Sequence, residues 1–456
     1  MEININPRKI YSEFEGFGAS GAWWAQEVGG WTHLDEKSGL AVRDEISRLL
    51  HDKSYGIGLR TYRYNIGAGS ADTMNGNIDN PLRRTESFDK GEGKYDFSKD
   101  ENAVYMMRQA AKDGADEIIL FVNSPIERLT KNGWSHLKKS QIMRDNLARK
   151  NYKAFAKYCL DVTEHFVKEG LPVKYLSPIN EPIWIWIGGQ EGCHYSPWTA
   201  ASVLKCFADE MNTRPALKDV KLSGVESGDI RWFNKSYTRA LMRYKSVRER
   251  IDAVDVHSYF LKFPIPVPFG LMDDRHAFLR RYRKWLDRKY PALPVKMSEW
   301  CHMQGGRDKT MKSALVMADV IYNDITLLNV TSWQHWIAVS EVDYCDGLIY
   351  INLDTKTYEM TKRYYATGNF SKYIPYKANR IDISCADNDL KLLAFEKDGK
   401  TVVIVTNDTQ KEKSIDVPCD TLVKLVVTNE TENLSEKTVN SKNITISARS
   451  VNTIIF

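Results

Sequence analysis

The sequence predicts an α/β protein in which a (β/α)8 TIM barrel is followed by a small β-sandwich. Eight short apolar runs, each followed by a loop and a longer helical pattern, lie between residues 13 and 336. Alternating strands and helices favour a parallel sheet, and eight such units favour a closed barrel. All twelve tryptophans lie between Trp23 and Trp336, and short strand patterns dominate the chain beyond them. This shift in composition predicts a second, β-rich unit.

The barrel strands are predicted from apolar runs that end in polar residues or turn residues. In chain order they span residues 13–19, 58–66, 117–124, 173–180, 220–227, 251–259, 294–300 and 330–336. The starts of successive strands are roughly 30–60 residues apart, which leaves room for a helix and two loops in each unit. Residues 151–170 carry apolar side chains at helical spacing and stop at Gly170. The basic run Arg275–Lys289 is interpreted as the solvated face of another helix.

The C-terminal part shows the pattern of a sandwich of short antiparallel strands. Residues 390–408 form two alternating runs joined at Asp398-Gly399, which is a hairpin signal. Similar runs continue to the last residue and favour a β-sandwich. The N-terminal residues precede the first barrel strand, and we expect them to pair with this sheet. The predicted domains are a (β/α)8 barrel, residues 13–360, and a β-sandwich side domain, residues 1–12 and 361–456.

Composition excludes several classes of protein. The formal net charge of +5 over 456 residues is too small to indicate nucleic-acid or membrane binding. The N-terminus lacks the apolar core of a signal peptide, so a cytoplasmic protein is expected, or a secreted one if a leader has been removed. The pairs Cys193-His194 and Cys301-His302 lack the spacing of metal ligands, so no metal site is expected. The sequence leaves the oligomeric state open.

Two glutamates end predicted strands on the same face of the barrel. Glu181 follows the fourth strand and Glu299 ends the seventh. In TIM barrels the C-terminal strand ends carry the active site. A lone strand-end glutamate is usually a cap or a salt-bridge partner, but both of these have aromatic neighbours and few nearby cations. Two carboxylates across one pocket, one protonated and one ionised, are what cleavage of a glycosidic bond requires.

The chain carries these motifs in order: "EGFGASGAWWA", "YRYNIGAGS", "VNSP", "SPINEP", "GGQEGCHYSP", "VHSYF", "MSEW" and "RYYATGNFSKYI". By this set it resembles the family 30 glycoside hydrolases of clan A over almost its whole length. Asn-Glu-Pro alone is shared by the whole clan, but the ordered set is specific. The stretches "NEPIWIWIGGQEGCHYSP" and "RYNIGAGS" look most like the branch that cleaves β-1,6-linked galactan.

The resemblance implies a retaining hydrolase with no metal or organic cofactor. Glu181 is expected as the acid/base and Glu299 as the nucleophile, with carboxyl groups about 5–5.5 Å apart. The implied substrate is β-1,6-galactan or its oligosaccharides, cut within the chain or from an end. The alternatives are another family 30 activity (β-glucosidase, glucosylceramidase or xylanase) or a non-catalytic carbohydrate-binding barrel, which both glutamates argue against.

The resemblance also implies a set of substrate-binding residues. Asn180 is expected to bind the sugar's 2-hydroxyl, and Arg63 is expected near the nucleophile, with Arg60 as the competing candidate. The full set is Asn180, Arg63, Asn123, Trp184, His257, Tyr259, Trp300 and Trp336. For each tryptophan, packing in the core is an equal alternative to stacking on a sugar.

Three further stretches bear on the prediction. Glu191 is a rival acid, which we interpret as a substrate contact or a loop ligand. The family carries a proline and an aromatic residue after "VNSP", and here Glu127-Arg128, within Ile126–Leu129, replaces that aromatic wall, so we expect that specificity differs if this loop lines the site. "GFGASG" matches Gly-x-Gly-x-x-Gly, but the helix and acidic residue of a dinucleotide-binding unit do not follow, which argues against a dehydrogenase.

Overall fold

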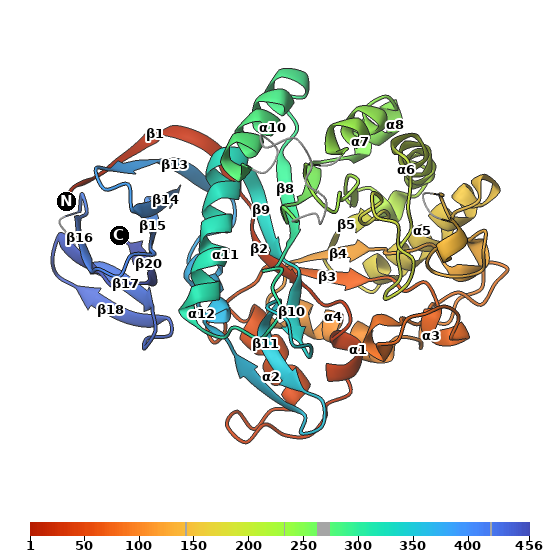
Figure 1. Cartoon of the computed structure of the whole chain (residues 1–456), viewed down its shortest axis with the longest axis horizontal. Helices are drawn as coiled ribbons and strands as arrows, with labels where there is room; N and C mark the ends of the chain where they lie inside the picture. Colours follow the sequence, from red (N-terminus) through yellow and green to blue (C-terminus); the bar gives the residue numbers. More distant parts are fainter. Residues whose placement is uncertain (142–143, 232, 262–273, 420–421) are drawn as a thin grey trace.

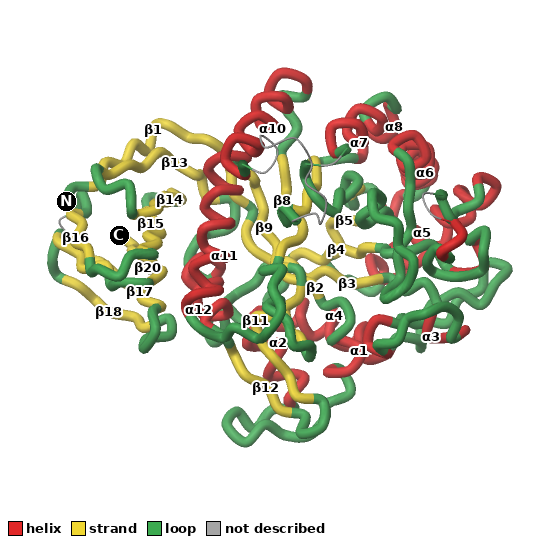
Figure 2. The backbone as a smooth tube through the Cα atoms, viewed as in Figure 1, coloured by secondary structure: helices red, strands yellow, loops and turns green. Residues whose placement is uncertain are grey.

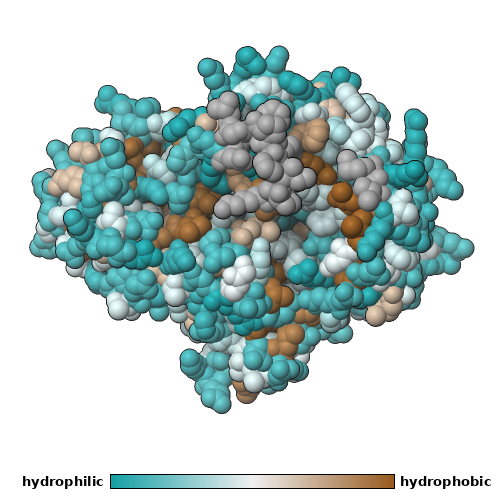
Figure 3. Space-filling model, viewed as in Figure 1, coloured by the Kyte–Doolittle hydropathy of each residue, from teal (hydrophilic) through white to brown (hydrophobic). Residues whose placement is uncertain are grey.

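The computed structural model has two parts, a barrel and a smaller group of antiparallel strands beside it (Figure 1). It describes residues 1–141, 144–231, 233–261, 274–419 and 422–456. Helices surround the barrel strands, whereas the smaller part consists of strands and loops (Figure 2). The visible face is mainly hydrophilic at its periphery, with apolar residues gathered nearer the middle (Figure 3).

Eight parallel strands form the barrel, as predicted. They are β2 (Gly16–Ser20), β3 (Thr61–Asn65), β4 (Glu117–Phe121), β5 (Val173–Ser177), β6 (Lys221–Leu222), β7 (Val254–His257), β8 (Val295–Trp300) and β9 (Val330–His335). Their order in the sheet is β6-β5-β4-β3-β2-β9-β8-β7. Single bridges Leu222–Ile251 and Ser227–Val256 join the two ends of this sheet. The sheet therefore closes into a barrel. The predicted fold class, a TIM barrel with a β-sandwich, is confirmed.

The helices alternate with these strands and cover the outside of the barrel. They are α1 (Ala25–Val28), α2 (Val42–His51), α3 (Ser70–Thr73), α4 (Glu101–Asp113), α5 (Tyr152–Lys168), α6 (Pro197–Met211), α7 (Asn234–Leu241), α8 (Lys245–Arg250), α10 (Arg275–Lys289), α11 (Met311–Asn323) and α12 (Lys362–Ser371). The basic run is α10, which buries Phe278, Tyr282 and Leu286 against the barrel and exposes most of its charged side chains. No helix in the described ranges is long and apolar enough to cross a bilayer.

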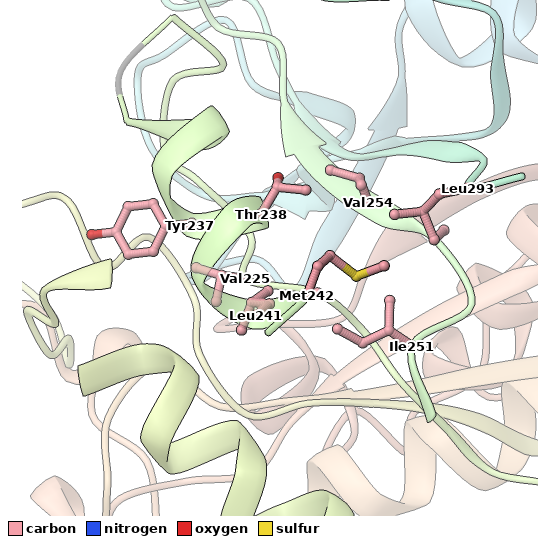
Figure 4. A pocket seen from close by; sticks show the side chains of 10 residues that line it. Val225, Tyr237, Thr238, Leu241, Met242, Ile251, Val254 and Leu293 are labelled. Carbon is pink, nitrogen blue, oxygen red and sulfur yellow. The ribbon is translucent and has the colours of Figure 1, made fainter. Parts of the chain in front are cut away.

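A small cavity under α7 is a packing gap. Its volume is about 10 Å³, which is room for about one water molecule. Val225, Leu241, Met242, Ile251, Val254 and Leu293 point toward it (Figure 4). This lining is almost wholly apolar, so the cavity offers a ligand neither room nor hydrogen-bonding partners.

The C-terminal strands form a seven-stranded antiparallel sheet and a two-stranded sheet. The larger sheet has the order β1 (Ile3–Phe14), β13 (Ala378–Cys385), β14 (Leu390–Lys397), β15 (Lys400–Asn407), β20 (Ser450–Ile455), β17 (Val423–Thr428), β18 (Ser435–Val439). The smaller one pairs β16 (Lys413–Asp416) with β19 (Asn443–Ile446). Asp398 and Gly399 both have positive φ, 52° and 75°, as a two-residue type I′ hairpin requires.

The N-terminal strand β1 pairs with β13, from Ile3 opposite Cys385 to Phe14 opposite Ala378. The chain then enters the first barrel strand at Gly16. The hydrogen bonds of β1 place it in the side sheet. We therefore propose two domains, a barrel of residues 13–360 and a side domain of residues 1–12 and 361–456.

A third sheet, which the sequence did not predict, follows the last barrel strand. It consists of β10 (Ile337–Ser340), β11 (Gly347–Asn352) and β12 (Thr357–Met360). The connection between β10 and β11, residues 341–346, contributes side chains to a cavity at the carboxyl end of the barrel. This small sheet therefore belongs structurally to the barrel's functional end.

The larger side sheet is buried on both faces. Along β14, Leu392 and Ala394 belong to the core inside the sandwich, whereas Leu393 and Phe395 belong to the core that continues into the barrel. This alternation follows from the two-residue period of a strand. The barrel and the side sheet therefore share one continuous apolar contact.

This shared core generates a stability prediction. Phe395→Ala removes a fully buried ring that packs 5.4 Å from the ring of Phe14. We expect the free energy of unfolding to fall by about 3–5 kcal/mol, from lost burial and the cavity left behind. Denaturant unfolding followed by tryptophan fluorescence measures it, with the exposed Leu422→Ala as control. A loss below about 1 kcal/mol would show that the contact matters little.

Candidate active site

Glu181 and Glu299 lie together at the carboxyl end of the barrel. Glu299 is in β8, and Glu181 follows β5. One oxygen of each carboxylate lies within 4.8 Å of the other, and Nδ1 or Nε2 of His257 lies within the same distance of both. Both side chains are nearly buried. The predicted meeting of two carboxylates that are distant in sequence is therefore present in the structure.

The backbone at Glu181 adopts an unusual conformation for a residue with a side chain. Its φ is +44°, in the left-handed region that such residues seldom occupy. The Glu181 N–H donates to the carbonyl of Glu226 at 2.8 Å, and its own carbonyl accepts a hydrogen bond from the indole N–H of Trp186 at 2.9 Å. These bonds hold the strained conformation and aim the carboxylate at Glu299. Such strain is found preferentially at functional sites.

Arg63 links two of the buried carboxylates. It extends from β3 and donates to Glu299 Oε2 at 3.1 Å and to Glu226 Oε2 at 3.0 Å, while its guanidinium lies 4.3 Å over the ring of Phe121. Burial would lower the pKa of Arg63, but Glu226 and Glu299 together raise it above its ordinary value. Arg60, the competing candidate, instead forms an ion pair with Asp116. The structure thus brings Arg63, and not Arg60, to Glu299.

His257 bridges the carboxylates from the end of β7. Nδ1 lies 2.8 Å from Glu181 Oε1 and 3.5 Å from Glu299 Oε1, and Nε2 lies 3.1 Å from Glu226 Oε2. Burial lowers the pKa of His257, but the three carboxylates outweigh it and raise the value to about 10. The ring is therefore an imidazolium that donates from both nitrogens.

The same protonation bears on metal binding. Glu181, His257 and Glu299 are close enough to hold an ion. A histidine ligand must be neutral and must free one nitrogen, whereas both nitrogens of His257 donate to carboxylates. Binding of an ion here would therefore require His257 to give up a proton and one of these hydrogen bonds.

Glu226 is a central residue that the sequence analysis missed. Its carboxylate accepts from Arg63, His257 and the hydroxyl of Ser177. Burial would raise the pKa of Glu226, but the Arg63 guanidinium and the His257 ring lower it to about 2. It lies in the predicted strand 220–227, so the strand-end rule that found Glu181 and Glu299 was available for it too.

Glu181 and Glu299 have different surroundings. Burial raises the pKa of Glu181, as does the nearby charge of Glu299, whereas the hydrogen bond from His257 opposes the rise. Glu299 accepts hydrogen bonds from Arg63 and, at 2.7 Å, from the hydroxyl of Tyr259. Two neighbouring carboxyl groups with such different environments are suited to separate acid and base roles.

A cavity of about 460 Å³ opens over these carboxylates. Its lining residues are Trp23, Arg83, Asn180, Glu181, Trp184, Trp186, Gln190, Tyr259, Leu261, Glu299, Cys301, Met303, Trp336, Val342, Asp343, Tyr344 and Asp346. Trp184 and Trp186 follow Glu181 in the chain, whereas Trp336 and Trp23 follow β9 and β2 and contact each other edge to face at 5.0 Å. Aromatic rings from three segments of the chain therefore line the cavity together with the carboxylate pair.

The predicted binding residues fall into three groups. Asn180, Trp184, Tyr259 and Trp336 line the cavity, and Arg63, His257 and Asn123 lie behind it in contact with residues that do. Trp300 does not line it: its ring packs 6.0 Å from Trp333 in the core. The position of Trp300 favours the core-packing alternative, and we do not propose it as a substrate contact.

Three asparagines form a hydrogen-bonded row next to Glu181. Asn180 donates to Asn123 Oδ1 at 3.1 Å, and Asn123 donates to Asn65 Oδ1 at 3.3 Å. Asn180 Oδ1 is buried and accepts no hydrogen bond within the described protein. A buried acceptor is costly to leave unpaired, which indicates a ligand group in the cavity.

The remaining candidates have structural partners. Glu191 accepts from the N–H of Ala68 at 3.1 Å and from Ser70, so it is a loop ligand rather than an acid at the cavity. Glu127 accepts from the N–H of Ser135, and Arg128 pairs with Asp89. Neither Glu127 nor Arg128 lines the cavity, so the expectation that this loop changes specificity has no support in the geometry.

Comparison with known proteins agrees with this arrangement. A family model described as O-Glycosyl hydrolase family 30 matches residues 1–350. An endo-beta-1,6-galactanase from Hypocrea rufa is 24% identical over 424 residues, which cover 89% of this chain and 80% of the relative. Among solved structures, a conserved exported protein from Bacteroides fragilis has a TM-score of 0.86 at 23% identity, with both chains covered completely.

The catalytic domain of a GH30 xylanase C from Talaromyces cellulolyticus has a TM-score of 0.75 at 18% identity, with 100% of this chain and 99% of that chain covered. At such identities the solved structures establish the shared fold, whereas the family model spans most of the chain. The protein therefore belongs to O-glycosyl hydrolase family 30 and is an enzyme that acts on a carbohydrate substrate.

Proposed function

We propose that the protein is a retaining hydrolase of β-linked galactosides, acting on β-1,6-galactan or its oligosaccharides. The observation that carries the chemistry is the pair of buried carboxylates, Glu181 and Glu299, with oxygens within 4.8 Å across the cavity. A pair about 5–5.5 Å apart serves double displacement, whereas inverting enzymes need about 6.5–9.5 Å to seat a water. The spacing therefore supports retention of configuration.

The first step joins the sugar to the protein. Glu299 attacks the anomeric carbon as a carboxylate, and a glycosyl ester forms as the glycosidic bond breaks. Glu181, whose pKa is raised chiefly by burial, gives its proton to the departing oxygen. The hydrogen bonds from Arg63 and Tyr259 orient Glu299 for the attack.

The second step releases the sugar. Glu181, now a carboxylate, takes a proton from a water molecule, and the resulting hydroxide attacks the anomeric carbon and breaks the ester. The His257 imidazolium, 2.8 Å from Glu181, stabilises the carboxylate that exists between the two steps. His257 and Arg63 are therefore positioning residues that balance the charges of the reacting pair.

Polar and aromatic groups of the cavity would bind the substrate. The unpaired Oδ1 of Asn180 is placed to accept a hydrogen bond from a sugar hydroxyl. Trp184, Trp186, Trp336 and Trp23 line the cavity, where their rings would contact sugar units of the substrate. Flat indole faces suit the apolar faces of sugars.

The galactan assignment is supported by the relative from Hypocrea rufa, which is described as an endo-beta-1,6-galactanase and aligns with 89% of this chain. A xylan backbone is the alternative, because a xylanase shares the fold over the whole chain. The same two carboxylates would cleave either substrate. Activity measurements are therefore needed to decide between the galactan and the xylan assignment.

The first prediction concerns the substrate. With β-1,6-galactosyl, β-1,6-glucosyl and β-1,4-xylosyl oligosaccharides of equal length, we expect kcat/KM to be highest for the galactosyl series. Chromatography of the products measures this and shows whether cleavage is internal or terminal. A clear preference for xylosyl or glucosyl substrates would overturn the galactan assignment and leave the carboxylate mechanism intact.

The second prediction concerns the two carboxylates. Glu299→Gln removes the nucleophile, and we expect kcat to fall by at least about 1,000-fold, equivalent to about 4 kcal/mol of barrier. Glu181→Gln removes the acid, with a loss of roughly 100- to 10,000-fold that shrinks for aryl galactosides whose leaving group needs no proton. A 2-deoxy-2-fluoro galactoside with a good leaving group should label Glu299, as peptide mass spectrometry would show. Labelling of another residue would refute the assignment.

The third prediction concerns pH. His257 lowers the pKa of Glu181, so His257→Gln should raise that pKa further. The acid would then stay protonated to higher pH, and the alkaline limb of the kcat/KM profile should move upward in pH. His165→Gln, a change at a partly exposed histidine beside Glu169, is the control and should leave the limb in place. A downward shift in His257→Gln would contradict the proposed acid.

A further inference from the structure

A second large cavity lies outside the catalytic site, beside the small sheet of β10, β11 and β12. Its volume is about 690 Å³, within the range of ligand pockets. It is lined by the loop of residues 33–37, by α2 and the turn after it, and by residues 355–360 before and along β12. The described residues that line this second pocket differ from those that line the catalytic cavity.

The small sheet connects the second pocket to the catalytic cavity. The connection before β11, residues 341–346, lines the catalytic cavity, whereas the turn after β11 contributes Thr355 and Lys356 to the second pocket. β11 itself has six residues. At about 3.4 Å per residue, the two cavities lie roughly 20 Å apart at opposite ends of one strand.

Glu45, on α2, is a carboxylate of the second pocket with only one of its oxygens paired. The residue is 2% exposed and lines the pocket, and its Oε1 accepts a hydrogen bond from the hydroxyl of Tyr55 at 2.8 Å. Its Oε2 is buried and accepts no hydrogen bond within the described protein, and no cation of the described chain forms an ion pair with it. A buried acceptor is costly to leave unpaired, so Glu45 indicates a ligand that donates hydrogen bonds.

Hydrogen bonds hold the opposite wall of the second pocket in place. His33 Nε2 lies 3.1 Å from the carbonyl oxygen of Lys356. Asp35 accepts from the hydroxyl of Tyr358 at 3.2 Å and from the N–H of Lys37 at 3.1 Å. These bonds tie the loop of residues 33–37 to β12. The pocket is therefore formed before a ligand binds, which lowers the cost of binding.

Tyrosine rings accompany the carboxylates of the second pocket. Tyr55, Tyr358 and Tyr365 all line it. The ring of Tyr55 is held by the guanidinium of Arg48, 4.0 Å from its centre, and the residue remains 45% exposed. Flat rings pack against the apolar faces of sugars, and carboxylates accept hydrogen bonds from sugar hydroxyls. This combination of groups is suited to carbohydrate.

The charges of the lining favour a neutral ligand over an ionic one. Glu359 is paired with Lys309 outside the pocket, at 2.7 Å. The other charged residues that line the pocket are three carboxylates and two ammonium groups: Asp35, Glu36, Glu45, Lys37 and Lys356. These charges nearly cancel. A neutral molecule rich in hydroxyl groups suits such a lining, because each hydroxyl both donates and accepts.

We propose that the second pocket is a binding site for a neutral β-linked oligosaccharide, namely a further stretch of the polysaccharide that the catalytic cavity cleaves. Tyr55 supplies a ring for a sugar face, and Glu45 accepts from sugar hydroxyls. The inference rests on the proposed function for the identity of the polysaccharide. The pocket would keep a long substrate on the enzyme and would make no difference to a substrate too short to reach it.

The first test measures binding without turnover, on the inactive Glu299→Gln variant. Its probes are β-1,6-galactosyl, β-1,6-glucosyl and β-1,4-xylosyl tetrasaccharides, with spermidine as a cationic probe. We expect one of the tetrasaccharides to slow hydrogen exchange in residues 33–37 and 353–358. Adding Tyr55→Ala or Glu45→Gln should abolish this slowing, while slowing around the catalytic cavity is kept. Tyr376→Ala is the matched control, because Tyr376 is 39% exposed and lines neither cavity.

The second test compares long and short substrates of the active enzyme. A chain that reaches two sites binds more tightly than one that reaches a single site. With Tyr55→Ala or Glu45→Gln, we therefore expect kcat/KM on the polysaccharide to fall about fivefold or more. The value on a disaccharide of the same linkage should stay unchanged, and both values should stay unchanged in Tyr376→Ala.

The inference is overturned if no tetrasaccharide slows exchange in residues 33–37 and 353–358, if only spermidine does so, or if the variants lose equally on polysaccharide and disaccharide. Failure of the galactosyl backbone alone is a different result. It would refute the galactan assignment, while the glucosyl or xylosyl probe that is bound or cleaved would still decide whether the second pocket holds carbohydrate.

Discussion

The site depends on five ionisable side chains that share one buried space: Glu181, Glu226 and Glu299 with Arg63 and His257. Each cation contacts at least two of the carboxylates. Burying an unpaired charge costs several kcal/mol, whereas a balanced group with well-formed hydrogen bonds is tolerated. When Glu181 carries its proton the group is electrically balanced, so the protonation state that the reaction needs is also the one that burial favours. Removal of Arg63, His257, Glu226 or Glu299 unbalances the rest.

The barrel makes this arrangement possible because it brings residues from five strand ends to one place. Arg63 comes from β3, Glu181 and Glu226 follow β5 and β6, His257 ends β7, and Glu299 lies in β8. Neighbouring parallel strands end at the same face, so short side chains from distant positions in sequence reach one another. The side sheet, buried on both faces, packs against the barrel through the core that includes Phe395. Arg63, His257 and Glu299 thus lie on strands, whereas Glu181 and Glu226 lie in the connections that follow β5 and β6.

Much of this was predictable from the sequence because strand ends carry a strong local signal. All eight barrel strands, the pair Glu181 and Glu299, and the positions of Arg63 and His257 followed from it or from the family motifs. Glu226 was missed although it stands next to the end of the predicted strand 220–227, where the same strand-end rule applies. Trp300 was wrongly expected in the cavity: adjacent strand residues point to opposite faces, and Glu299 already occupies the inward position. Asp89, the partner of Arg128, is 39 residues away, and Glu127 also accepts a hydrogen bond from Thr73, 54 residues away, so local patterns could not identify these contacts.

The pairing of β1 with β13 also affects how the protein is made. During synthesis β1 leaves the ribosome before the whole barrel, whereas its hydrogen-bonding partner emerges after it. An unpaired strand edge is prone to associate with other chains while it waits. Pro7, Arg8 and Lys9 interrupt the middle of β1, at a point where its register with β13 is irregular. Proline and positive charges are the features that discourage such association, so the strand carries its own protection until the C-terminal sheet is complete.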